Sequence, residues 1–312
     1  MLTIYPGKEI RTMKPCVATI GFFDGVHRGH RFLIERLKED AEQTGLESTV
    51  ITFERHPRQV LSADYQPKLL TSFDEKMLLL SKTGVDNCAV LQFDRQMALL
   101  TAREFMERVL GGLLNVKKLY IGYDHRFGHN REESFEDYVR YGRELGIEVV
   151  RNTAFDLEGV NVSSSVIRSF LQEGEVEMAA RCLGYPYFLS GKVMPGVQEG
   201  RKLGFPTANI EVPAEKLIPA SGVYAVSARL ENTAAMLPAM MNIGTRPTFG
   251  ENNQTLEVHI LDFEDDIYDK ELLVGFEHRM RGERKFKSAE DLARQLRLDA
   301  QEVRTYMMKG EL

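Results

Sequence analysis

The chain has few cysteines and no segment apolar enough to cross a membrane. Its three cysteines, Cys16, Cys88 and Cys182, lie far apart in 312 residues and form no C-x-x-C pair. This spacing argues against a disulfide framework or a zinc ribbon, and each cysteine is expected to fill space in a core. No apolar run approaches the roughly 20 residues of a membrane span, and the N-terminus lacks the apolar core and cleavage site of a signal peptide. We therefore expect a cytoplasmic location and no membrane partner.

Basic residues are not concentrated anywhere in the chain, whose net charge is −6. The short cluster of Arg279, Arg284 and Lys285 is interrupted by Glu283 and has the composition of a solvated strand end. A nucleic-acid surface needs a denser basic patch, so no nucleic-acid partner is expected. The sequence gives no sign of an oligomeric state. Hydrophobic residues make up 43% and charged residues 28%, which is ordinary globular usage and, at this length, favours two domains.

The first part of the chain alternates short apolar runs with helical patterns. The predicted strands are Cys16–Ile20, Thr49–Phe53, Cys88–Phe93, Lys118–Ile121 and Glu148–Arg151. The helix-start signatures between them are the capping boxes Ser72/Glu75, Thr101/Glu104 and Ser134/Asp137. Continuous apolar strands that alternate with helices predict a parallel sheet covered on both faces.

The second part of the chain has strand-like runs that follow one another with only turns between them. These runs are Tyr187–Val193, Gly222–Leu230, Met236–Ile243, Thr255–Phe263 and Glu271–His278. They predict an antiparallel barrel or sandwich. A final helix is capped by Ser288 and Asp291, and its buried stripe is Leu292, Leu296, Val303 and Met307. We place the boundary near Gly184–Tyr185, which gives domains 1–184 and 185–312.

A glycine- and histidine-rich segment, Gly21 to His30, follows the first predicted strand and opens the first helix. Loops at the carboxyl ends of parallel strands bind ligands, and a helix N-terminus there attracts phosphate. Gly21, Gly25 and Gly29 permit close backbone approach, and His27 and His30 have the spacing to face the same group. A glycine turn with two capping histidines is an equally good interpretation of this segment alone. A zinc site is a poorer one, because no further ligand stands at a recognisable spacing.

This segment resembles the signature of the bacterial bifunctional riboflavin kinase/FAD synthetase family. Three further segments resemble that family's motifs in the same order, at Phe53–Pro57, Ile121–Gly128 and Val162–Arg168. Four ordered motifs are far more specific than any one of them. The resemblance implies an N-terminal Rossmann-like, doubly wound parallel-sheet nucleotidylyltransferase domain. A C-terminal antiparallel β-barrel riboflavin kinase domain with a terminal helix would follow.

The resemblance also implies the N-terminal reaction and the residues that serve it. The FMN phosphate would attack the α-phosphorus of ATP, and pyrophosphate would leave. The residues implied at the ATP site are His27, His30 and Arg168 in catalysis, with Gly21, Phe22, Asp24, Gly29 and Ser164 in ATP binding. Those implied around FMN are Phe53, Pro57, Asp124 and Phe127.

This chain departs from the family pattern at four positions. Glu54 and Arg55 stand where Asp-Pro is usual, and His125 replaces a common Phe. These three changes affect the packing of the flavin. Asn161 precedes the Ser-Ser motif where a basic residue is frequent, which removes one phosphate contact.

A second constellation lies in Gly200 to Asn209, where Thr207 and Asn209 stand two residues apart. In an extended stretch their oxygens point the same way, and hard oxygen ligands suit Mg²⁺ that carries ATP phosphates. Alone, Pro-Thr-Ala-Asn is better read as a turn. Glu257 lies inside an alternating strand, where a carboxylate is usually a solvent-facing residue.

The Gly200–Asn209 segment also closely resembles the riboflavin kinase motif. Pieces that follow in family order are Gly222–Tyr224, Asn242–Phe249 and Leu256–Asp262. The resemblance implies that Glu257 is the general base for the riboflavin 5′-hydroxyl. It implies that Gly204, Thr207 and Asn209 bind ATP, the last two with Mg²⁺. Arg279 and Arg281 would border the flavin.

Three functions fit these motifs. The first is an enzyme with both activities, whose small-molecule substrates and products are ATP, riboflavin, FMN and FAD. The second keeps the kinase but gives the N-terminal half a different phosphorylated alcohol. The third is a flavin-sensing or flavin-carrying protein with degenerate catalysis. The intact His27, His30, Arg168 and Glu257 argue against the third function, because catalytic decay would be expected to remove at least one of them.

Overall fold

A computed structural model of the chain describes residues 1–6, 13–61, 66–123, 125–195, 199–231, 233–245 and 254–309. Asp124, which we predicted in the flavin site, lies outside the described residues. By backbone contacts the chain forms two compact units, Met1–Ser164 and Ser165–Leu312. None of the described helices has both the length and the apolar character needed to cross a membrane.

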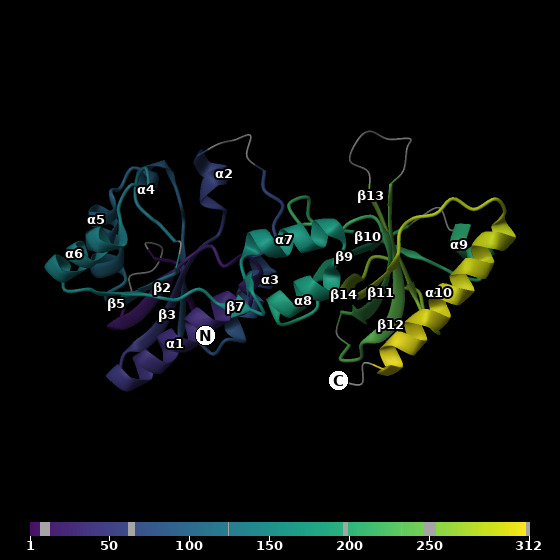
Figure 1. Cartoon of the computed structure of the whole chain (residues 1–312), viewed down its shortest axis with the longest axis horizontal. Coiled ribbons are helices and arrows are strands. Elements are labelled where there is room, and N and C mark those ends of the chain that lie inside the picture. The colour runs from purple at the N-terminus through teal and green to yellow at the C-terminus, as the bar shows by residue number, and fades with distance from the viewer. Residues whose placement is uncertain are drawn as a thin grey trace. The chain divides into compact units, whose positions relative to one another are not determined.

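The first unit is built on a six-stranded sheet in the order β1-β4-β3-β2-β5-β6, and every neighbouring pair is parallel (Figure 1). The strands are β1 (Leu2–Ile4), β2 (Cys16–Ile20), β3 (Glu47–Phe53), β4 (Asn87–Leu91), β5 (Val116–Ile121) and β6 (Glu148–Arg151). The five predicted strands are confirmed. The edge strand β1 was missed because its three residues are too few to show a pattern.

Helices cover both faces of this sheet, as predicted for a doubly wound fold. They are η1 (Asp24–Val26), α1 (Arg28–Thr44), α2 (Pro57–Leu61), α3 (Phe73–Ser81), α4 (Arg95–Ala98), α5 (Ala102–Phe105), η2 (Met106–Leu113) and α6 (Phe135–Leu145). Val17 packs with Leu33 and Leu37 of α1, whereas its neighbours Cys16 and Ala18 pack with the cluster that includes α5 and η2. Alternate strand residues therefore face opposite helical layers.

All three predicted capping boxes are present. The side chains of Ser72, Thr101 and Ser134 accept hydrogen bonds from the third helical residue, whose own carboxylate bonds back to the cap. Such caps fix the first residue of a helix because they satisfy backbone N–H groups that the helix itself leaves unpaired. A small hairpin, β7 (Asp156–Leu157) and β8 (Val160–Asn161), ends this unit.

The second unit contains a closed antiparallel barrel in the order β10-β13-β12-β11-β14-β9. Its strands are β9 (Phe188–Met194), β10 (Ala208–Glu211), β11 (Gly222–Leu230), β12 (Leu237–Thr245), β13 (Gln254–Ile260) and β14 (Glu271–Arg281). The barrel alternative and the five predicted strands are confirmed. The sixth strand, β10, begins inside the segment that resembled a Pro-Thr-Ala-Asn turn.

The helices of this unit are α7 (Ser164–Glu173), α8 (Val176–Leu183), α9 (Glu199–Lys202) and α10 (Ala289–Lys309). The terminal helix α10 runs along the barrel (Figure 1), where Val303 and Ala300 pack on Ala225 and Met240, flanked by Leu296 and Met307. Ser288 caps its first turn by accepting from the backbone N–H of Asp291 at 3.1 Å. The outer surface of β11 and β12 is thus covered, and this face also carries the kinase motif.

Candidate active sites

The phosphate loop, defined as Gly21–His30, leaves β2 where the sheet order reverses. From β2 the chain continues to β3 on one side, while β5 flanks β2 on the other. Doubly wound sheets bind ligands at the carboxyl ends of strands at such a switch point. The loop then opens α1, whose N-terminal N–H groups and dipole favour an anion.

The two histidines of the phosphate loop lie against each other. His27 is the N-cap of α1, and its Nδ1 accepts a hydrogen bond from the backbone N–H of His30 at 3.3 Å. The two rings stack with 3.6 Å between centroids and 18° between planes. His27 therefore caps α1 through one ring nitrogen, and the prediction that both histidines face the same phosphates stays a prediction.

His30 is held neutral by its surroundings. Burial, followed by the positive charges of His27, His125 and Lys76, lowers its pKa well below the ordinary value of 6.5. Within the described part of the chain, its buried Nδ1 has no hydrogen-bond partner. Since an unpaired buried nitrogen is costly, this atom is suited to a polar group of a ligand.

Asp24 shapes the loop from within. Its buried carboxylate accepts from the backbone N–H groups of Leu70 and Thr71, at 2.9 and 3.0 Å, and from the hydroxyl of Thr71 at 3.2 Å. The hydroxyl of Ser164 donates to the backbone oxygen of Asp24 at 3.0 Å. Asp24 thus connects the Val162–Arg168 motif to the phosphate loop. Its role in ATP binding stays a prediction.

The loop backbone is both tight and strained. Phe23 and Val26 have φ angles of 57° and 36°, which side chains other than glycine rarely adopt and which accumulate at functional sites. The N–H of Gly21 bonds to Ile51 of β3 at 3.0 Å. A Cβ on Gly29 would lie 3.2 Å from the His27 ring and from the backbone oxygen of Val162, so a side chain here would crowd both groups.

The residues predicted around FMN divide between the core and the loop. Phe53 and Phe127 are both buried in one hydrophobic cluster, and Phe127 stacks on Tyr138 with 4.4 Å between centroids. Pro57 is half-buried and opens α2, which is a favoured position for proline. The ring of Phe22 meets His56 edge-on at 4.7 Å, so the phosphate loop contacts the flavin loop, defined as Phe53–Pro57.

Arg168 lies four residues after Ser164 in α7 and is half-buried. Residues four apart share one face of a helix. The start of α7 is tied to the phosphate loop through Ser164, and Arg168 belongs by backbone contacts to the second unit. Its contact with ATP phosphates stays a prediction.

On the barrel, two of the predicted kinase residues, Asn209 and Glu257, share a row of paired positions. Asn209 of β10 pairs with Glu257 of β13, and Glu257 pairs with Asn242 of β12. Directly opposed residues of antiparallel strands carry side chains on one face, with Cβ atoms about 5 Å apart. A Cβ on Gly244 would lie 3.2 Å from the Asn242 amide nitrogen and 2.9 Å from Glu283 Oε1. This glycine therefore leaves space within a cluster of oxygen-bearing side chains.

A histidine that the sequence analysis left without a role supports this row. His259 lies two residues beyond Glu257 on the same face, and its Nδ1 is 2.7 Å from the backbone oxygen of Pro206. Phe205 meets the His259 ring edge-on at 5.2 Å, and burial is the main cause that lowers the His259 pKa. His259 thus fixes the segment that ends in the half-buried Thr207. The predicted Gly204 lies in an exposed turn just before this segment.

The two arginines predicted beside the flavin both make contacts within the chain. Arg281 donates to Asp299 of α10, which is 1% exposed, through Nε at 3.1 Å and Nη2 at 2.7 Å. Arg279 donates to the backbone oxygen of Glu173 at 2.9 Å and to that of Ser221 at 3.0 Å. These contacts hold both guanidinium groups against neighbouring parts of the second unit. Their contact with flavin stays a prediction.

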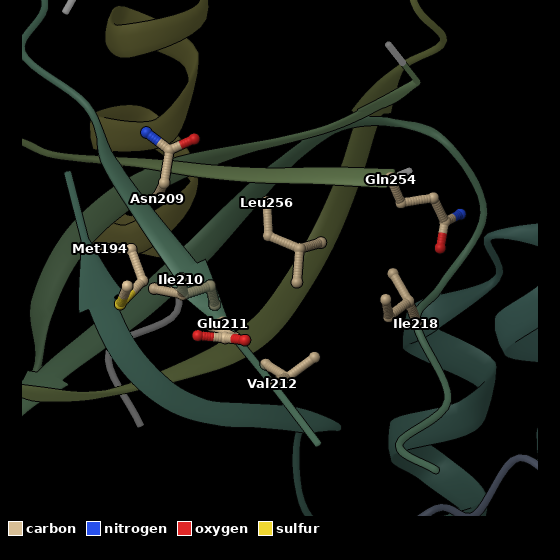
Figure 2. A pocket seen from close by; sticks show the side chains of 8 residues that line it. All are labelled: Met194, Asn209, Ile210, Glu211, Val212, Ile218, Gln254 and Leu256. Atoms are coloured by element: carbon tan, nitrogen blue, oxygen red, sulfur yellow. The ribbon is translucent and has the colours of Figure 1, made fainter. Parts of the chain in front are cut away.

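A cavity of about 260 Å³ lies beside this row. Its lining residues are Met194, Asn209, Ile210, Glu211, Val212, Ile218, Gln254 and Leu256. Figure 2 shows Leu256, Val212 and Ile218 around the cavity, with the Asn209 amide directed away from them at its edge. Ile210 and Leu256 alternate with Asn209 and Glu257, so an apolar space and a polar row use opposite faces of the same two strands.

These two sites, on a doubly wound sheet and on a closed barrel, define a two-part nucleotide-handling protein. The family model for FAD synthetase matches residues 9–166, and the family model for riboflavin kinase matches residues 183–307. The chain belongs to the bifunctional riboflavin kinase/FMN adenylyltransferase family.

Relatives match over nearly the whole chain. The bifunctional riboflavin kinase/FMN adenylyltransferase of Escherichia coli K12 is 39% identical over 291 residues, 93% of this chain and 92% of that protein. The protein of the same name from Listeria monocytogenes is 39% identical, over 95% of this chain and 93% of its own. A crystal structure described as a macrolide-efflux protein from Streptococcus pneumoniae has a TM-score of 0.88 and 32% identity, covering 97% of this chain and 98% of that one.

Proposed function

We propose that this chain makes FAD from riboflavin in two ATP-dependent steps, riboflavin to FMN in the C-terminal domain and FMN to FAD in the N-terminal domain. The observation that carries this proposal is the order of the two family models, which match consecutive ranges that do not overlap. Each range holds its own cluster of polar side chains. The two family models and the curated relatives all name flavin chemistry, whereas efflux appears only in the description of that structural relative.

In the kinase step, Glu257 accepts the proton of the riboflavin 5′-hydroxyl. The freed oxygen attacks the γ-phosphorus of ATP, the bond to the bridging oxygen breaks, and ADP leaves. The oxygen donors of Thr207 and Asn209 fit Mg²⁺, and such an ion, when bound, would neutralise charge on the ATP phosphates. The residues themselves contribute alignment and one proton acceptor.

The cavity beside Asn209 has a lining suited to a flat aromatic ring. Its apolar lining from Ile210, Val212 and Leu256 can cover a flat ring, and Gln254 and Glu211 supply polar groups at its edge. Such a mixture of apolar walls and few polar groups is typical of cofactor sites.

In the adenylyl step, an oxygen of the FMN phosphate attacks the α-phosphorus of ATP, and the bond to pyrophosphate breaks. No protein nucleophile and no proton transfer are required. His27, His30 and the N-terminus of α1 hold the ATP phosphates, and Ser164 and Arg168 approach from the start of α7. Catalysis therefore rests on alignment and on stabilisation of charge that shifts between phosphates.

One reaction mixture tests this proposal against its alternatives. Purified protein receives riboflavin, ATP and Mg²⁺, and the flavins are separated by chromatography. FAD supports the two-step enzyme, FMN alone indicates a kinase joined to a different nucleotidylyltransferase, and unchanged riboflavin indicates a flavin carrier or sensor. Omission of Mg²⁺ in a parallel sample tests the proposed metal. We place the enzyme in the cytoplasm, with small molecules as its partners.

We propose Gly184–Tyr185 as the boundary between the two activities, because every predicted kinase residue follows it. Helix α8 precedes this boundary, and its buried side chains Val176, Ala179, Cys182 and Leu183 are 0% exposed. We expect residues 165–312 and residues 185–312 both to phosphorylate riboflavin. The shorter fragment should melt at a lower temperature, since it loses the apolar burial of α8, worth about 1.5–3 kcal/mol for each large side chain.

Thermal melts and FMN formation by the two fragments check this expectation. A folded 185–312 fragment without kinase activity would count against the proposed boundary. Equal melting temperatures would show that α8 adds nothing to the stability of the barrel.

A further inference from the structure

Lys76 of α3 is a lysine with a buried side chain, only 2% exposed. Its Nζ donates to the backbone oxygen of Phe53 at 2.7 Å and to that of Phe22 at 3.2 Å. It also stands 4.1 Å from the centre of the Phe22 ring. Burial of an ammonium group is costly even when hydrogen bonds to carbonyls partly compensate for the lost water. The charge therefore calls for a reason other than packing.

The two carbonyls that Lys76 binds belong to two different loops. Phe22 lies in the phosphate loop, two residues after β2, and Phe53 is the last residue of β3 and the first of the flavin loop. Strands β2 and β3 are parallel neighbours, with Ile20 opposite Ile51. One ammonium group thus joins the carboxyl ends of two strands, at the point where their loops separate.

Helix α3 is itself anchored to the phosphate loop. The capping box of Ser72 and Glu75 fixes its first turn, one residue before Lys76. The residues just before this cap, Leu70 and Thr71, donate three hydrogen bonds to the Asp24 carboxylate. Asp24 and Lys76 therefore hold the phosphate loop to α3 at two points, and Lys76 alone of the pair also reaches the flavin loop.

We propose that Lys76 is a positioning residue for adenylyl transfer, which holds the phosphate loop and the flavin loop at a fixed separation. This inference rests on the function proposed above for the N-terminal domain. With the separation fixed, the FMN phosphate meets the α-phosphorus of ATP in line with the leaving pyrophosphate. Lys76 acts through the two loop backbones, so its loss changes the separation of the loops while the side chains proposed to bind each substrate remain.

The charge on Lys76 itself changes in mildly alkaline solution. Burial lowers its pKa to about 8, and Asp24 and Cys88 partly oppose this effect. Burial raises the pKa of the Cys88 thiol to about 12, and His30 stays neutral because its pKa is lowered. Above about pH 8 the Lys76 amine keeps its donors but loses the charge that strengthens the two hydrogen bonds.

The same shift fixes the effect of Lys76 on stability. The pKa of Lys76 in the folded protein lies below the ordinary value of 10.5, so the unfolded chain holds this proton more tightly. The charge therefore costs stability at neutral pH, and the cost falls as the pH rises from about 8 to 10.5. Lys76→Met removes this cost but also leaves the Phe22 and Phe53 carbonyls without the hydrogen bonds from Nζ, so the two effects on the melting temperature at pH 7 oppose each other.

The test compares Lys76→Met and Lys76→Arg with Lys82→Met, which removes an exposed lysine just after the same helix. FAD formation from FMN and ATP gives kcat and KM, and riboflavin phosphorylation by the same chain is the internal control. Misplaced reactants commonly cost about 10²-fold in rate. We expect Lys76→Met to lose ten- to a hundredfold in kcat for FAD, with each KM within about threefold of wild type.

Arginine should recover part of the lost rate, and Lys82→Met should match wild type in both reactions. In the unmodified enzyme kcat for FAD formation should fall above about pH 8, and this fall should be absent in Lys76→Met. Unchanged kcat in Lys76→Met overturns the proposal. So does an equal loss of FMN and FAD formation in Lys76→Met, which would indicate general damage to the fold, or a wild-type kcat that stays level from pH 7 to 9. Wild type that makes FMN but no FAD instead refutes the proposed adenylyl function.

Discussion

Replacement of Glu257 by glutamine should lower FMN formation from riboflavin by about 10²–10⁴-fold, the usual cost of a lost general base. Glutamine keeps the shape of the side chain beside Asn209 and Asn242 but cannot accept the hydroxyl proton. FAD formation from supplied FMN should remain, because the adenylyl reaction uses none of these residues. The measurement is the initial rate of each product with riboflavin or FMN as the substrate.

Glu271→Gln is the matched control, since Glu271 is an exposed carboxylate at the start of β14. It should leave both rates unchanged. Near-normal kinase activity in Glu257→Gln would show that Glu257 is only a surface residue of its strand. Another group would then have to remove the proton.

Replacement of His30 by alanine should have the opposite selectivity. Loss of one preorganised group that stabilises charge in a transition state commonly costs about 10²–10³-fold in turnover. The half-buried ring of His30 stacks on His27 at the N-terminus of α1, where the ATP phosphates are proposed to bind. We expect FMN to accumulate from riboflavin while FAD formation nearly stops. Both products are measured in one reaction mixture, and circular dichroism checks the fold.

His129→Ala is the control for this variant, because His129 is an exposed histidine of the same unit. Its activities should equal those of wild type. The double variant of His27 and His30 should lose less than the product of the two single effects, since the rings act as one unit. If FMN and FAD fell together in a folded His30→Ala protein, the histidines would serve the kinase or the joint stability of the chain.

Much of the fold follows from local rules that the sequence displays. The apolar runs gave β2 and β6 to the residue, and the three capping boxes gave the starts of α3, α5 and α6. These features depend on neighbouring residues alone. The closure of the barrel was one of two alternatives, because the pairing of β10 with β9 and β13 joins residues far apart in the chain.

The residues that support the proposed sites were harder to predict than the residues proposed to carry chemistry. His27, His30 and Glu257 stand in motifs whose spacing is local. Lys76 gave no signal, because its partners Phe22 and Phe53 are backbone oxygens more than twenty positions away. His259 lies within the predicted Leu256–Asp262 motif, but only its contact with the Pro206 backbone oxygen reveals its supporting role.

The cap at the C-terminus of α7 shows that the boundary between the compact units differs from the boundary proposed between the two activities. Arg279 of β14 binds the last carbonyl of α7, and the glycine after it, Gly174, has no room for a side chain beside this guanidinium. The same helix carries Arg168, which we assign to the adenylyl reaction. A cut after Ser164, between the two compact units, would therefore leave Arg168 in the fragment that carries the kinase residues. A cut after Gly184 would keep it, but would free the end of its helix from the arginine that caps it. Neither cut therefore keeps Arg168 with its proposed reaction and its helix with the arginine that caps it.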